Sequence, residues 1–319
     1  MLGRSRKAPR LPRDVEEVFE AALARLGAKV GKWKGVVLHF ERRDEPGVLD
    51  TSEHLEILDD APARTPVDGL AIYLGSRLGI PVPEDLALDL RAVRPWLRPR
   101  VLPMRALEGP SRAMCRRPAF GTTPEHAPAP DLISAVSVGA GRSATFVTTR
   151  ALDAWNLEFD DVMKLAFGNL RRLVGPDDLH DVESAGGGGP GAEGVLSLND
   201  PSLETGASAA LVIDHLLPES ATPEGVLFGV PSLDTFLALP VRRGAGARSL
   251  AALVQVVFTM TSQHAEPLSE VVLWRRATSR GGQTDAVPMT SIHEGASRRV
   301  HLEAHGVVEE LLRILGEIE

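Results

Sequence analysis

The stretch LISAVSVGAGRSATFVTTRALDAWNLEFDDVMKLAFGNLRRLV, residues 132–174, carries the clearest structural pattern in this chain. Its first half predicts two strands, Leu132–Val138 and Ser143–Thr148, joined by a turn at residues 139–142. A helical turn carrying Trp155 follows. The second half predicts a helix, because residues of one stripe recur there at intervals of three and four. The stripe consists of Val162, Leu165, Ala166, Asn169 and Leu173.

Similar patterns recur on both sides of this stretch. Amphipathic helices are predicted at residues 14–26, 66–78, 250–261 and 307–318, and strands at residues 36–40, 54–58, 226–230, 235–241, 271–274 and 299–304. Helices and strands alternate irregularly, and several strands follow one another through turns. The sequence therefore predicts an α+β fold with mixed or antiparallel sheets and amphipathic helices, instead of a regular doubly wound sheet.

Composition divides the chain into segments. Residues 1–13 hold five basic residues and no apolar run, which predicts a basic flexible tail, with an anionic partner as the alternative. Residues 109–130 contain five prolines and no hydrophobic period. They predict a linker or long loop between two α+β subdomains, residues 14–108 and 131–319. Six glycines within residues 185–194 predict a flexible loop in the second subdomain.

The charge and cysteine content limit the class of protein. The 319 residues carry 35 Lys and Arg against 43 Asp and Glu, a net charge of −8, whereas a general nucleic-acid binder presents a basic excess. Cys115 is the only cysteine, which excludes an intramolecular disulfide and favours a reducing compartment. No apolar run approaches the roughly 20 residues of a membrane span. We therefore expect a cytoplasmic protein that binds no membrane. The acidic total also disfavours a third idea, nucleic-acid binding through the basic tail.

One basic loop, Arg242–Ser249, lies between a predicted strand and a predicted helix. It holds Arg242, Arg243 and Arg248, and backbone N–H groups at a helix N-terminus bind anions. Its glycine spacing matches neither the dinucleotide fingerprint nor a P-loop with its lysine. Two interpretations remain open, namely a phosphate or anion site and a solvated turn in which Ser249 caps the helix.

Three potential metal ligands alternate near the end of the chain. His301, Glu303 and His305 would share one face of a strand, and imidazole and carboxylate groups are ligands that zinc accepts. Apolar residues occupy the other face, so an ordinary half-buried strand explains the same pattern. The polar Asn169 on the apolar helix stripe also has two interpretations, a structural amide or a ligand contact.

Several short segments stand in an order that is found in a known family. They are Leu102-Pro103-Met104-Arg105, Leu152 with Trp155, Ala166-Phe167-Gly168-Asn169-Leu170, Ala207-Ser208-Ala209-Ala210, Val230-Pro231-Ser232-Leu233-Asp234 and Pro267-Leu268-Ser269. Over residues 14–275 this set resembles the YtpQ-like family of bacterial proteins of unknown function, although Leu233 stands where that family usually has Arg. The resemblance implies a soluble cytoplasmic bacterial protein and no established activity. It makes Arg105, Trp155, Asn169 and Asp234 candidate binding residues.

No set of acid, base, nucleophile or metal ligand converges in the sequence, and its glycine-rich and proline-rich segments are of the kind that order on binding. The sequence therefore predicts a non-enzymatic adaptor or regulatory module that uses no cofactor and binds another protein. The alternative is a hydrolase or phosphate-binding enzyme that uses the Arg242–Ser249 loop or a metal site at His301, Glu303 and His305.

Overall fold

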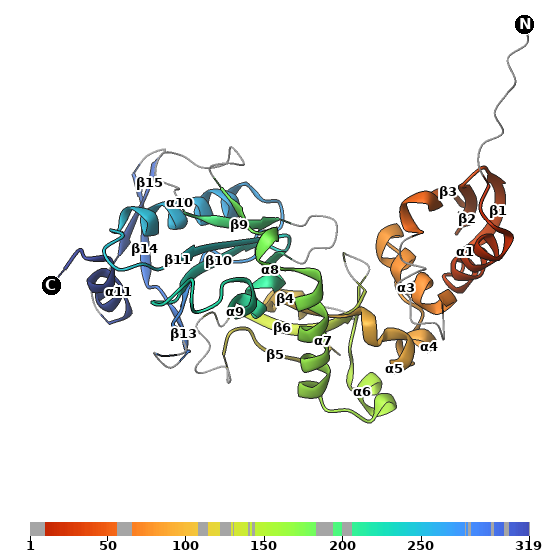
Figure 1. Ribbon diagram of the computed structural model, residues 1–319, viewed down its shortest axis with the longest axis horizontal. Helices are drawn as coiled ribbons and strands as arrows, with labels where there is room; N and C mark the ends of the chain where they lie inside the picture. The colour runs from red at the N-terminus through yellow and green to blue at the C-terminus, as the bar shows by residue number, and fades with distance from the viewer. Residues whose placement is uncertain are drawn as a thin grey trace, which may run out of the picture. The chain divides into compact units, whose positions relative to one another are not determined.

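A computed structural model describes residues 10–55, 66–107, 114–121, 129, 131–139, 141, 144–182, 194–199, 206–277, 279, 282–294, 297–302 and 306–318. Within these residues the protein has the predicted α+β fold, and the strand pairs whose register is described are antiparallel. The chain forms two compact units, whose elements are labelled in Figure 1. Unit 1 comprises residues 1–97 and 137–157, and unit 2 comprises residues 98–136 and 158–319.

Unit 1 begins with a helix and a three-stranded antiparallel sheet. After α1 (Arg13–Arg25), the strands β1 (Lys29–Lys34), β2 (Val37–Arg42) and β3 (Glu45–Asp50) pair in chain order. Helix α3 (Pro66–Leu78) packs against α1. The side chains buried in this part of unit 1 include Phe19, Leu23, Leu38, Leu49 and Leu74.

The prediction of a strand at residues 54–58 is wrong for residues 54 and 55, and residues 56–58 lie outside the described residues. His54 ends the 3-10 helix η1 (Thr51–His54). The side chain of Asp50 accepts a hydrogen bond from the Ser52 N–H at 3.0 Å and caps this helix. This capping hydrogen bond begins a helical turn directly after Asp50, where the extended backbone of β3 ends. The observed strand therefore precedes the predicted one in the sequence.

The second segment of unit 1, residues 137–157, is joined to the first segment by hydrogen bonds. The Gly139 N–H donates to the carbonyl of Trp96 at 3.1 Å, and the Trp155 Nε1–H donates to the carbonyl of Leu88 at 3.1 Å. The remaining elements of unit 1 are α4 (Glu84–Ala87), α5 (Leu90–Val93), η2 (Arg94–Trp96), β7 (Thr145–Phe146) and α6 (Thr149–Trp155). The strand predicted at 143–148 is therefore confirmed only at its centre, as β7.

Unit 2 is organised around a six-stranded sheet with the order β13-β12-β10-β11-β9-β8. Its strands are β8 (His180–Asp181), β9 (Leu196–Asn199), β10 (Val226–Ser232), β11 (Thr235–Pro240), β12 (Val272–Arg275) and β13 (Thr284–Ala286). The central hairpin of β10 and β11 is buried along almost its whole length. Both faces of the sheet are therefore covered, which explains why these strands read as continuous apolar runs.

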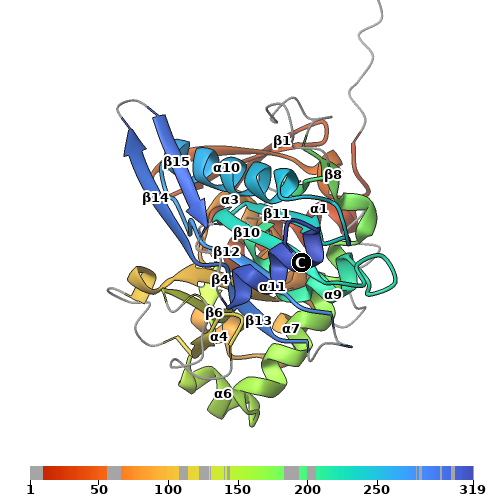
Figure 2. The same ribbon diagram turned by 90° about the vertical axis from the view of Figure 1, so that its left-hand side faces the viewer.

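Two apolar clusters cover the two faces, because successive residues of a strand point to opposite sides. Phe228 and Phe236 belong to one cluster, and Leu227, Leu237 and Trp274 belong to the other. The second cluster lies under α10, which runs along the sheet in Figure 2, and under α11. The helical elements around the sheet are α8 (Gly206–Ala209), η7 (Ala210–Val212), α9 (Ile213–Leu216), α10 (Arg248–Gln263) and α11 (Val307–Leu315).

A second sheet begins unit 2, with the order β4-β6-β5. The last two residues of β6, Ser137 and Val138, belong to unit 1 and pair there with β7. The predicted strand 132–138 is confirmed as β6, and the predicted helix is confirmed as α7. The buried stripe of α7 is rotated from the predicted one, because Met163 and Leu170 are buried whereas Leu173 is 44% exposed. The remaining elements are β4 (Leu97–Pro103), η3 (Met104–Leu107), β5 (Arg116–Pro118), β6 (Leu132–Val138), α7 (Phe159–Leu173), η6 (Pro176–Asp178) and the hairpin β14 (Met289–Glu294) and β15 (Ser297–Leu302).

The chain passes between the units after Leu97, Val136 and Leu157, and none of these points lies in the predicted linker at residues 109–130. Most of that linker, most of the basic tail and nearly all of the glycine-rich loop lie outside the described residues, so these three predictions stay predictions. None of the helices in the described ranges combines the length and the apolar character that a membrane crossing requires.

Candidate functional site: a cleft between two sheet edges

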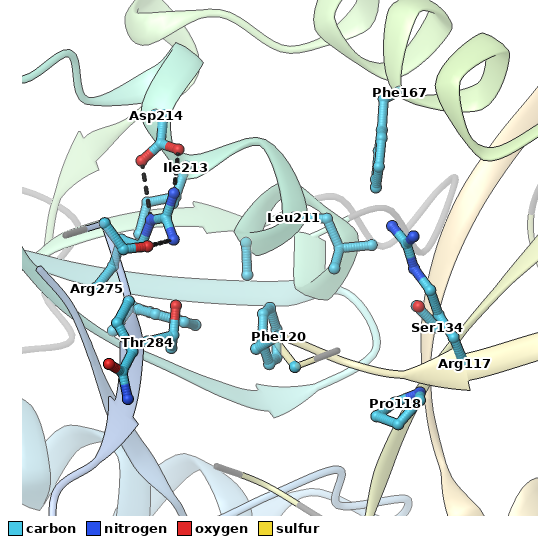
Figure 3. Close-up of a pocket in the computed structure, with 15 residues that line it drawn as sticks. Arg117, Pro118, Phe120, Ser134, Phe167, Leu211, Ile213, Asp214, Arg275 and Thr284 are labelled. Atoms are coloured by element: carbon cyan, nitrogen blue, oxygen red, sulfur yellow. Dashed lines mark hydrogen bonds and ion pairs between the residues drawn. The ribbon is translucent and has the colours of Figure 1, made fainter. Parts of the chain in front are cut away.

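Unit 2 contains a cleft of about 560 Å³, which we call the edge cleft because the outer strands of two sheets line it. Arg117 and Pro118 on β5 form one side, and Thr284 on β13 forms the opposite side. Figure 3 shows Phe120 between these two sides, with Leu211 near it and Ile213 near Asp214 and Arg275. The cleft is therefore built from segments that lie far apart in the sequence.

The base of the edge cleft is aromatic. The rings of Phe120 and Phe228 meet edge to face with their centroids 5.2 Å apart, and the ring of Phe236 lies 6.2 Å behind that of Phe228. Phe228 is 1% exposed and belongs to the apolar core on this face of the central sheet, and the partly buried Phe120 packs against that core. A partly buried Leu211 extends this apolar surface. An apolar side chain of a ligand would lose its contact with water here without disturbing the core.

Two arginines stand at opposite sides of this apolar base. Arg275 makes a two-point ion pair with Asp214, with N–O distances of 2.8 and 3.2 Å, and also donates to the carbonyl of Gly282. Arg117 pairs with Asp160 at 3.2 Å, and its guanidinium lies 5.7 Å from the ring centroid of Phe167. Each arginine is thus paired with one carboxylate, and the four charges sum to zero. The side chain of Arg117 is still 39% exposed, so its guanidinium remains accessible to a carboxylate of a ligand.

Strand β13 presents a hydrogen-bonding edge beside the cleft. The Arg276 N–H donates to the carbonyl of Gln283 at 2.9 Å, and the Val287 N–H donates to the carbonyl of Val272 at 2.9 Å. Because backbone groups alternate in direction along an antiparallel strand, Thr284 and Ala286 direct their N–H and C=O groups away from β12. Among the described strands, β13 ends its sheet, so these groups face no further strand there.

Strand β5 on the other side is a poor edge for strand pairing. The Ala119 N–H donates to the carbonyl of Leu132 at 3.0 Å, so residue 118 directs its backbone away from β6. Residue 118 is a proline, which has no N–H to donate. The edge of β13 therefore offers an N–H at each of its outward-facing positions, whereas the edge of β5 lacks one at Pro118.

Two of the predicted binding residues, Arg105 and Asp234, lie in a different part of unit 2. Arg105 donates a hydrogen bond to the carbonyl of Pro267. Arg105, Pro267 and Leu233 line a cavity of about 470 Å³. Asp234 accepts hydrogen bonds from the hydroxyls of Ser232 and Thr235, and its carboxylate lies 3.7 Å from His264 Nε2. Its side chain therefore fixes the turn between β10 and β11.

Four of the short segments that suggested a family resemblance meet at this turn. Arg105 donates to the carbonyl of Pro267, the Ala207 N–H to the carbonyl of Leu233 at 3.2 Å, and the Leu268 N–H to the carbonyl of Pro231 at 2.8 Å. The Val101 N–H, directly before the first segment, donates to the Ser208 hydroxyl at 3.3 Å. The first and the last of these segments are more than 100 residues apart in the sequence, yet all four belong to one hydrogen-bonded junction. The contacts are mostly backbone contacts, which indicates a structural role for the segments.

The other two predicted residues from these segments are buried. Trp155 is 7% exposed and holds residues 137–157 in unit 1 through its hydrogen bond to Leu88. Asn169 is 7% exposed on α7, as expected for a polar residue on the buried stripe. Neither residue lines the edge cleft.

The basic loop before α10 is held by the end of the chain. The N–H groups of Gly244 and Gly246 donate to the carbonyls of Ile314 and Leu315, each at 3.0 Å, and the Ala247 N–H donates to the carboxylate of Glu317 at 2.7 Å. Arg243 pairs with Glu224. The predicted cap at Ser249 is wrong, because α10 begins at Arg248 with Ala247 as its N-cap residue. Glu317 takes the place of a local capping side chain.

In the described part of the chain, no three His, Cys, Asp or Glu side chains are placed to hold a metal ion. His301 lies on β15 opposite Thr290, but its side chain and the whole of Glu303 and His305 lie outside the described residues. The predicted metal site therefore stays a prediction.

No family model, curated protein or solved structure matches this chain. The resemblance to the YtpQ-like family consequently stays a prediction.

None of the residues that line the edge cleft was predicted from the sequence as a functional residue. Arg117 and Phe120 stand three residues apart in the proline-rich segment, and this pairing of a cation with an aromatic ring was the one local signal. The pairing of Asp214 with Arg275 spans 61 residues and leaves no pattern in the sequence. Also missed were Arg98 and Arg100 on β4, which are 9% and 2% exposed. Burial, together with the nearby Arg172, lowers the pKa of Arg98 to about 10.

Proposed function

We propose that unit 2 is a non-enzymatic protein-binding module and that the edge cleft holds an extended segment of another protein. The observation that carries this proposal is the outward-facing backbone of Thr284 and Ala286 beside the aromatic base of the cleft. An incoming strand would pair with β13 through its main chain, and its alternate side chains would enter the cleft. We also place the protein in the cytoplasm, because its single cysteine suits a reducing compartment.

The walls of the cleft specify the side chains of the partner segment. An apolar side chain fits above Phe120 and Phe228, where it would be removed from water. An acidic side chain fits near Arg117, whose side chain is 39% exposed and is held in place by Asp160 and Phe167. We therefore expect the partner segment to be extended and to alternate apolar and acidic residues.

Selection from a random display library of 12-residue peptides on the purified protein tests the proposal. Enriched peptides should share an apolar residue and an acidic residue at strand spacing. Their affinity is then measured by fluorescence polarisation on the wild type and on variants. Arg117→Glu should weaken binding at least tenfold, because it replaces attraction by repulsion of the acidic residue. Arg248→Glu, an exposed arginine outside the cleft, is the matched control and should leave the affinity within twofold.

A second pair of variants tests the strand pairing itself. Thr284→Pro removes the N–H that faces the incoming strand, whereas Thr284→Val keeps that N–H and a similar side-chain shape. Binding should be lost in the first variant and retained in the second. Peptides that bind all four variants alike, or the absence of any enriched peptide, would contradict the proposal.

A further inference from the structure

A second cavity in unit 2, of about 300 Å³, lies at the open end of the β10–β11 hairpin, and we call it the apolar cavity. Leu227, Leu239, Val241 and Leu315 line it, and each of them is at most 5% exposed. These side chains come from β10, from the end of β11 and from α11. The volume is at the lower end of the range for small-molecule sites, and the walls suit a short hydrocarbon chain.

Two polar side chains, Arg242 and Ser249, also line the apolar cavity. Arg242 is exposed and Ser249 is partly exposed. Within the described ranges, neither side chain has a hydrogen bond or an ion pair. A guanidinium and a hydroxyl therefore remain available to a ligand whose other end lies against the buried leucines. A charged guanidinium binds a carboxylate with good geometry and strength.

The backbone of the same loop is not available to an anion. The N–H groups of Gly244, Gly246 and Ala247 already donate to the carbonyls of Ile314 and Leu315 and to the carboxylate of Glu317. A phosphate held by a loop of N–H groups is therefore disfavoured, and an anion held by side chains is favoured. Glu317 and Glu224 also offset part of the charge of the three arginines, so the loop suits one negative charge better than two.

We propose that the apolar cavity binds a monocarboxylate with a short aliphatic tail. The carboxylate is held by Arg242 and Ser249, and the tail lies against Leu227, Leu239 and Leu315. This inference does not depend on the edge cleft, because the two cavities share no lining residue.

Isothermal titration calorimetry of the full chain with octanoate tests the proposal. Octanoate should bind saturably with one site per chain. Octylamine has the same tail with the opposite charge, and acetate has the charge without the tail. Inorganic phosphate has no tail and carries more negative charge than a carboxylate. Each of these three should bind at least tenfold more weakly. Octylamine that binds as tightly as octanoate, or octanoate that shows no saturable binding at millimolar concentration, overturns the proposal.

Three variants locate the site. Arg242→Gln should weaken octanoate binding at least tenfold, while the matched control Arg248→Gln, in the same loop but outside the cavity, should change it less than twofold. Ala245→Phe places a large side chain at an exposed position of the cavity wall and should abolish binding. All three positions are on the surface or near it, and the thermal unfolding midpoint of each variant checks that it is folded. Equal losses in the two arginine variants, or full binding by Ala245→Phe, would also overturn the proposal.

Discussion

Gly206 begins α8 at a point where the backbone of the β10–β11 turn passes directly beside its Cα. A Cβ atom at this position would lie 1.9 Å from the carbonyl oxygen of Asp234. We expect Gly206→Ala to lower the free energy of unfolding by about 3 kcal/mol, because the backbone of the turn must move to make room. Urea denaturation measures the effect.

The matched control is Gly168 in the middle of α7. A Cβ atom there meets nothing within 4 Å. Alanine should therefore raise the free energy of unfolding by about 0.5–1 kcal/mol, through its lower backbone entropy in the unfolded chain. Equal effects of the two substitutions would show that the contact between Gly206 and Asp234 is not tight.

His54 gives unit 1 a dependence on pH. Burial lowers its pKa below the ordinary value of 6.5, with Arg77 acting in the same direction and Glu53 in the opposite one, and its Nδ1 lies 3.1 Å from the hydroxyl of Tyr73. A histidine with a lowered pKa in the folded state takes up a proton more readily when unfolded. The free energy of unfolding should therefore fall as the pH drops below about 6.5.

Urea denaturation at pH 7.5, 6.5 and 5.5 measures this dependence. Tryptophan fluorescence is a suitable signal, because Trp33, Trp96 and Trp155 lie in unit 1, and Trp274→Phe removes the signal from unit 2. His54→Gln should flatten the pH dependence, and the control His39→Gln should keep it. A slope that survives His54→Gln would assign the dependence to another group.

At the scale of elements, one arginine joins two strands and a helix in unit 2. The guanidinium of Arg276 lies 4.3 Å from the ring centroid of Trp274 and pairs with Asp285 on β13 and Glu310 on α11. Its side chain is 16% exposed. Arg276→Met should cost about 2–3 kcal/mol of unfolding free energy, because it removes this partner from the mostly buried Asp285 and from the more exposed Glu310, and also removes the guanidinium from the Trp274 ring.

The control for this prediction is Arg313→Met on α11. Arg313 pairs with Glu309 one turn away, and its side chain is 53% exposed. Exposed pairs of this kind contribute about 0.3–0.5 kcal/mol. Denaturation of both variants in parallel gives the comparison, and a cost for Arg276→Met as small as that for Arg313→Met would rule out the joining role.

Elements with a regular apolar pattern could be predicted from the sequence, and elements without one could not. The helix α7 and the strand β6 were predicted because their burial follows from periodic apolar residues. Strand β1 carries the exposed Lys29, Lys32 and Lys34, and its alternation is interrupted by a bulge between residues 30 and 33. Strand β13 has three residues and no apolar pattern. The edge cleft depends on β13, so the sequence could not predict it.

At the scale of the whole molecule, unit 1 is completed only by residues 137–157. We expect a fragment of residues 10–97 to unfold without cooperativity, because it lacks Trp155 and the hydrogen bonds to Leu88 and Trp96. The same fragment joined to residues 137–157 by a short Gly-Ser linker should unfold cooperatively. The hydrogen bond between Gly139 and Trp96 shows that a short linker can span the gap.

Thermal unfolding followed by circular dichroism compares the two fragments. A fragment of residues 10–97 that unfolds cooperatively, at the midpoint of the joined fragment, would contradict the prediction.

This arrangement has a consequence for synthesis on the ribosome. The segment that completes unit 1 ends 60 residues after Leu97, at Leu157. Because synthesis proceeds at roughly 5–20 residues per second, the second segment leaves the ribosome about 3–12 s after the first. During that interval residues 10–97 lack the segment that completes their fold, and a chaperone at the exit tunnel has time to bind their apolar side chains.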